Sequence, residues 1–194
     1  MSRRSRRVQV DLNVRGLTDI PDSDLHAILR GADDIIGKGG RSLLTNILRG
    51  SKSKPVLENG LDESPVYGYF RHLSRDDTLA RIDWAILNRY LRIEYGAHLP
   101  VLVFTDKGWE IAREIRANEL LEGILAAVSD GPPYRMEHLK DRDRGMILLL
   151  LDKIEATGEA KVIPPLHAWK ENDYKKVRLR INQVIRRLDA CEKR

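Results

Sequence analysis

The chain contains 194 residues, with 34 Lys and Arg against 29 Asp and Glu, which gives a formal net charge of +5. Hydrophobic residues make up 42% and charged residues 32% of the sequence, which is typical of a globular domain and excludes a disordered chain. The single cysteine excludes an intrachain disulfide and a four-cysteine zinc site. We therefore expect one domain or two small ones in a reducing compartment.

No segment predicts a membrane span or a secretion signal. The longest aliphatic run, residues 146–151, is far shorter than the roughly 18 residues that cross a bilayer. The four arginines within residues 1–7 are followed by no apolar segment of the kind found in signal peptides. We therefore expect a cytoplasmic protein without membrane contact, which would be nucleoid-associated in a bacterium.

The first predicted elements follow a basic tail, which we assign to residues 1–16. Apolar residues at helical spacing predict three helices, separated by Gly-containing breaks, over residues 22–36, 41–49 and 75–88. Ser74 and Asp77 form a capping-box pattern at the start of the third helix. β-Branched and aromatic runs over 91–95 and 101–104 then predict a β-hairpin with a short loop.

Three helices followed by a hairpin are the order of a winged helix-turn-helix. We assign this fold, mainly α with a β-hairpin wing, to residues 17–118. A further helix is predicted from Asp106 to about Val128, and a linker rich in Gly and Pro follows it. Residues 119–194 are predicted to form a small α-helical unit, with later helices over 141–156, 163–171 and 173–190. Part of this unit is faintly similar to a HEAT-type helical hairpin.

Basic residues are concentrated in three segments of the chain. Residues 1–7 carry a net charge of +4, residues 35–57 carry +5 with no acid, and residues 173–194 carry +5. The rest of the chain therefore carries −9. A concentrated positive charge favours a polyanionic partner such as nucleic acid. The alternative, a solvated helix face, remains open, above all for the C-terminal segment.

Two glycine-containing motifs and the hairpin resemble the corresponding segments of a known domain family. The stretch GGRSLLTNILRGS over 39–51, PVYG over 65–68 and the hairpin that ends in LVFT over 102–105 resemble the RQC domain. This domain is the winged helix that follows the helicase core and zinc subdomain of RecQ-family DNA helicases. The resemblance covers roughly half of the chain and is not a catalytic signature.

The resemblance implies binding of duplex DNA near a fork, largely through phosphates, with a wing tip that can part the terminal base pair. It places Arg49 and Ser51 in the phosphate-contacting turn after the second helix, and Ser74 at a later helix start that approaches the DNA backbone. The chain departs from the family in having no helicase motor and no four-cysteine zinc subdomain, and its wing tip is short. We therefore expect a stand-alone RQC-like protein that binds DNA.

The residue types favour the same region independently of the family. Backbone N–H groups at a helix start, Ser hydroxyls and Lys or Arg side chains are the groups that hold phosphates. Phosphate contacts carry no sequence information, so we expect recognition of DNA structure, with Arg41, Thr45 and Asn46 as the plausible base readers. The candidate DNA-binding residues are Lys38, Arg41, Ser42, Thr45, Arg49, Ser51, Lys52, Ser53, Lys54, Ser74, Tyr95 and His98.

Aromatic residues offer two further hypotheses. Tyr95 and His98 at the wing tip are candidates for a strand-separating wedge; alternatively, Tyr95 packs on its strand and His98 is an ordinary turn residue. The three tryptophans, Trp84, Trp109 and Trp169, are candidates for a base-stacking surface or for packing within the core.

No pattern predicts catalysis, a metal site or a cofactor. The glycine-rich stretch 37–40 lacks the spacing of a phosphate-binding P-loop, and the five histidines lack metal-ligand spacing. Paired aspartates lie near predicted helix ends, where capping explains them. We therefore expect a non-enzymatic protein without a cofactor.

The sequence thus predicts a protein that recognises duplex or fork DNA and assists a partner in DNA repair, replication or recombination. The partner, a helicase or another protein, would bind in trans through residues 119–194. Two alternatives remain open: a protein-interaction adaptor, and a transcription regulator that reads a specific DNA sequence through the winged helix.

Overall fold

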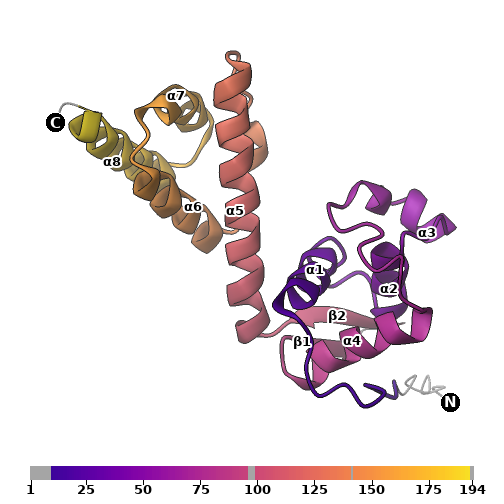
Figure 1. The fold of residues 1–194 in the computed structure, drawn as a ribbon. Helices are drawn as coiled ribbons and strands as arrows, with labels where there is room; N and C mark the ends of the chain where they lie inside the picture. Colours follow the sequence, from indigo (N-terminus) through magenta and orange to yellow (C-terminus); the bar gives the residue numbers. More distant parts are fainter. Residues whose placement is uncertain (1–9, 96–98, 141, 193–194) are drawn as a thin grey trace, which may run out of the picture. The chain divides into compact units, whose positions relative to one another are not determined.

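The computed structural model describes residues 10–95, 99–140 and 142–192 (Figure 1). The chain forms two compact units, residues 1–112 and 113–194. The division falls within the long helix α5, Asp106–Asp130. The boundary that we expected between residues 118 and 119 lies in the same helix.

The first unit has the predicted order of helices followed by a hairpin (Figure 1). A short helix, α3, stands between α2 and α4 and has no counterpart in the sequence prediction, because four residues are too few to show a periodic pattern. The elements are α1 (Asp22–Asp33), α2 (Arg41–Arg49), α3 (Lys54–Leu57), the 3₁₀ turn η1 (Leu61–Glu63), α4 (Arg75–Leu87), β1 (Leu91–Tyr95) and β2 (Pro100–Phe104).

The hairpin is joined to the helices by backbone contacts. Strands β1 and β2 pair antiparallel, with Leu91 opposite Phe104. On the other edge of β2, the amide of Gly37 donates to Leu102 O (2.9 Å), and the amide of Leu102 donates to Gly39 O (2.8 Å). The loop that leads into α2 therefore fixes the position of this helix against the hairpin. This architecture confirms the winged-helix prediction.

The predicted capping box and one tryptophan are both part of this unit's framework. Ser74 Oγ accepts a hydrogen bond from the amide of Asp77 (3.0 Å), which caps α4 as expected. Trp84 is buried, and its Nε1 donates to Thr18 O (3.1 Å). Core packing is therefore the correct interpretation of Trp84.

The C-terminal end of α2 is crossed by the backbone of a distant segment. The amides of Gly68 and Phe70 donate to the carbonyl oxygens of Ile47 (2.9 Å) and Leu48 (2.7 Å). Gly50 ends α2 with φ +70°, and a Cβ built there would lie 3.1 Å from Gly68 Cα. Both the left-handed φ and the close approach require glycine at position 50. The crossing explains why the two glycine-containing motifs occur together in the sequence.

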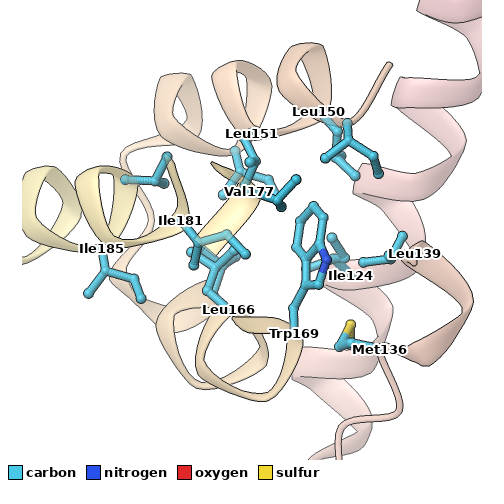
Figure 2. Close-up of a cluster of buried hydrophobic side chains, with 14 of the residues drawn as sticks. Ile124, Met136, Leu139, Leu150, Leu151, Leu166, Trp169, Val177, Ile181 and Ile185 are labelled. Carbon is cyan, nitrogen blue, oxygen red and sulfur yellow. The ribbon is translucent and has the colours of Figure 1, made fainter. Parts of the chain in front are cut away.

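The second unit is helical throughout its regular elements. Its helices pack around a cluster of apolar side chains that includes Leu150, Leu166 and Ile181 (Figure 2). Trp169 lies at the centre of this cluster, 1% exposed, with its Nε1 donating to Asp173 Oδ2 (2.7 Å). Trp169 is thus a core residue. The helices are the C-terminal part of α5, α6 (Arg144–Thr157), α7 (Ile163–Asn172) and α8 (Lys175–Glu192), with the 3₁₀ turns η2 (Glu137–Leu139) and η3 (Ala160–Val162).

Ion pairs join α6 to α8 at the edge of this core. Arg180 Nη2 lies 2.6 Å from Asp152 Oδ1 and 2.8 Å from Glu155 Oε2, and Arg187 also pairs with Glu155. The hydrogen bond from Arg187 lowers the pKa of Glu155, against the opposing effect of burial. These ion pairs therefore stabilise the packing of the two helices; Arg180 is largely buried by them, whereas Arg187 stays exposed.

We predict that Gly50→Ala destabilises the protein more than Gly60→Ala does. Gly60 has φ +63° with no atom within 4 Å of a built Cβ, so alanine there adds backbone strain alone, about 1 kcal/mol. At Gly50 the same strain is joined by a clash with the backbone of Gly68, and we expect a loss of roughly 2 kcal/mol or more in the free energy of unfolding. Urea unfolding of both variants measures the difference. Equal losses would show that the crossing has enough room for a Cβ.

Candidate nucleic-acid interface

Three cations lie at the end of α2 and in the turn that joins it to α3. Arg49, Lys52 and Lys54 are all exposed, and Arg49 Nε donates to Leu73 O (3.3 Å). Ser51 and Ser53 are half-buried between them, and Ser51 Oγ accepts from the amide of Ser53 (3.2 Å). Cationic side chains, hydroxyls and loop amides are thus gathered in six residues. This turn presents the three kinds of group that bind a phosphate.

A second segment adds basic residues that sequence reasoning missed. Arg71, His72 and Arg75 are exposed, and they follow the backbone that crosses the end of α2. Arg71 Nε donates to Gly68 O (3.0 Å), which places its guanidinium beside the crossing. The signal in the sequence was the run of basic residues soon after the Tyr-Gly motif. We call Arg49, Lys52, Lys54, Arg71, His72 and Arg75 together the basic surface.

Carboxylates border the basic surface. Glu58 lies 3.4 Å from Lys54, an exposed pair of the kind that contributes little and is broken readily. Asp76 and Asp77 stand in the first turn of α4, where Arg15 lies 3.6 Å and 3.3 Å from them. The first turn of α4 is therefore less attractive to phosphate than the turn after α2.

Two further candidates lie at the opposite end of α2. Lys38 and Ser42 are exposed beside a cavity of about 620 Å³ between the start of α2 and the hairpin. At about 1.5 Å per residue, this end of α2 lies roughly 12 Å from Arg49. The sequence-predicted residues thus form two groups, one at each end of the helix.

Arg41 and Thr45 do not face solvent as base readers would. Arg41 pairs with Asp83, which is 1% exposed, and the other carboxylate oxygen of Asp83 accepts from the amide of Asn13 (2.8 Å). Thr45 is fully buried and donates to Arg41 O (2.8 Å). Reading of bases by these two side chains is inconsistent with their placement. The sequence could not show this, because Asp83 is 42 positions away from Arg41.

Of the remaining candidates, Ser74 precedes Arg75 of the basic surface, and Tyr95 and His98 belong to the hairpin sequence. The Ser74 hydroxyl makes two hydrogen bonds with Asp77: it accepts from the amide of Asp77, and it donates to Asp77 Oδ2 (2.6 Å). Tyr95 is 42% exposed at the end of β1 and does not pack into the core. His98 lies outside the described residues. The role of the wing tip stays a prediction.

Comparison with known proteins decides the family. The sequence model of the RQC domain matches residues 23–120, about half of the chain. The chain belongs to the RQC domain family. The match includes the basic surface, the crossing at Gly50 and the hairpin. RQC is a DNA-binding winged-helix domain without catalytic activity of its own, so membership supports DNA binding in general.

One curated relative is similar to part of the chain. The ATP-dependent DNA helicase RecQ of Bacillus subtilis (strain 168) is 31% identical over 88 residues, which are 45% of this chain and 15% of the helicase. The chain therefore spans less than a fifth of the length of this relative. No solved structure matches the chain.

Across residues 10–95, 99–140 and 142–192, no three His, Cys, Asp or Glu residues are grouped to hold a metal ion. No helix in the same ranges is both long and apolar enough to cross a membrane. The basic surface lies within the range that the RQC model matches.

We predict that Arg41→Ala lowers stability and leaves the affinity for duplex DNA unchanged. Removing Arg41 leaves the buried Asp83 carboxylate without its cation, and we expect a loss of about 3 kcal/mol in the free energy of unfolding. The double variant Arg41→Met, Asp83→Leu should recover part of it, because both charges are removed together. Urea unfolding and DNA binding at a temperature where all variants are folded test this. Weaker DNA binding without a loss of stability would show that Arg41 contacts DNA.

Proposed function

We propose that this protein binds the sugar-phosphate backbone of duplex or fork DNA through the basic surface, without reading a strict sequence. The strongest support for this proposal is that backbone hydrogen bonds join the two segments that carry the basic residues at the end of α2. Cations carried by two backbone segments that are hydrogen-bonded together can contact several phosphates of a duplex at once.

The composition of α4 favours structure recognition over a sequence code. In many winged helices the helix before the hairpin enters the major groove. Here that helix presents Asp76 and Asp77 at its first turn, and Asp83 is buried within it. A helix with more acidic than basic residues is a poor fit to the negatively charged groove. The alternative of a sequence-specific regulator therefore has less support.

We further propose that the protein is not an enzyme by itself and acts beside a partner. The curated relative is a DNA helicase, and the part of it that matches this chain is a small share of its length. Under this proposal the domain anchors a motor protein, or another repair factor, at a fork. Residues 119–194 are the part of the chain available to hold that partner.

We predict that Arg49→Glu with Lys52→Glu weakens binding to a blunt duplex and to a fork. Each lost phosphate contact should reduce the slope of log affinity against log salt by about 1, so the pair should reduce it by about 2. Fluorescence anisotropy over a salt series measures both quantities. Two duplexes of unrelated sequence should bind equally well.

The matched control reverses the same number of charges elsewhere. Lys161→Glu with Lys170→Glu, in the second unit, changes the net charge by the same amount and should leave the slope unchanged. If both double variants lower the affinity equally, the effect reflects total charge and the basic surface is not the site. Strong preference for one DNA sequence would instead favour a regulator.

A further inference from the structure

The second unit contains a cavity that the proposed function does not use. It has a volume of about 480 Å³ and lies where η2 and the starts of α6 and α8 meet. Its apolar floor is formed by Leu139, Ile147 and Val177, all of which belong to the buried cluster of this unit; Leu139 and Val177 are labelled in Figure 2. A floor made of core side chains gives the cavity a fixed shape.

The rim of this cavity is strongly basic. Arg142, Arg144, Lys175 and Lys176 line it, and Arg142 Nε donates to His138 O (2.7 Å), which orients its guanidinium. In the described part of the chain, Arg144, Lys175 and Lys176 make no ion pair with an acid. Four cations therefore surround an apolar hollow.

Two acids near the cavity, among the residues that the structure describes, are hydrogen-bonded within the fold. Asp173, which also lines it, accepts from Trp169 Nε1 (2.7 Å) and from the amide of Tyr174 (2.7 Å). Asp143 accepts from the amide of Met146 (2.8 Å) as the cap of α6. Because these carboxylates are already hydrogen-bonded, they reduce the attraction of the rim for an anion only in part.

An aromatic ring stands at the mouth of the cavity. Tyr174 is 59% exposed, although it is a large side chain beside a well-packed core. Lys140 Nζ lies 5.5 Å from the centre of its ring. An exposed ring beside several cations is the combination by which proteins hold unpaired nucleotides, with a base stacked on the ring and phosphates on the cations.

We propose that this cavity is a second DNA site, which binds an unpaired strand: a base stacks on Tyr174, and the flanking phosphates contact Arg144, Lys175 and Lys176. The choice of DNA as the ligand rests on the proposed function; the site itself is independent of the basic surface. A fork offers both a duplex and an unpaired strand, so one chain with two sites would hold both parts.

The test uses the full chain and a labelled oligothymidine strand. Tyr174→Ala should weaken binding of this strand at least about fivefold, because stacking of a base on an aromatic ring is lost. Tyr174→Phe should bind like the wild type, since the ring is kept. Leu179→Ala, which truncates an exposed side chain on α8 that does not line the cavity, is the control and should have no effect.

The outcomes separate this inference from the proposed function. Lys175→Glu with Lys176→Glu should weaken binding of the single strand and leave binding of a blunt duplex unchanged, whereas Arg49→Glu with Lys52→Glu should do the reverse. Unchanged binding of the single strand by Tyr174→Ala overturns the inference. An oligoaspartate peptide that competes as well as the DNA strand also overturns it, because the cavity would then be a site for acidic peptides.

Discussion

The backbone contact between Gly50 and Gly68 is the constraint on which the candidate interface depends. The amides of Gly68 and Phe70 donate two hydrogen bonds to the last turn of α2 at this contact, and a Cβ at Gly50 would lie only 3.1 Å from Gly68 Cα. Arg49 and Arg71 are both anchored to carbonyl groups near this crossing. The backbone segments that carry the cations are therefore held side by side, so that cations from both can contact the phosphates of one duplex.

The order of the elements was predictable from sequence, because it depends on local patterns. The periodic apolar residues of α2 and α4, the capping box at Ser74 and the alternating runs of the hairpin each gave the correct element. The end of α6 at Gly158, which has φ +67°, was also predictable, since a left-handed cap favours glycine. These features require no knowledge of distant contacts.

The composition of the site was less predictable, because it depends on contacts between distant positions. Arg41 looked like a free cation, but a buried aspartate on α4 binds it. Thr45 looked like a base reader, but the packing of α2 against α4 buries it. Arg71 and Arg75 were missed for the opposite reason: they join the site through the crossing, which the sequence shows only as a pair of glycine motifs.

Hydrogen exchange of the full chain, with and without a blunt duplex, tests the central claim most directly. If the basic surface contacts the phosphates, DNA should slow exchange of the amides in residues 50–54 and 67–75 and leave those of α7 unchanged. Slower exchange confined to other parts of the chain, with residues 50–54 unaffected, would contradict the account.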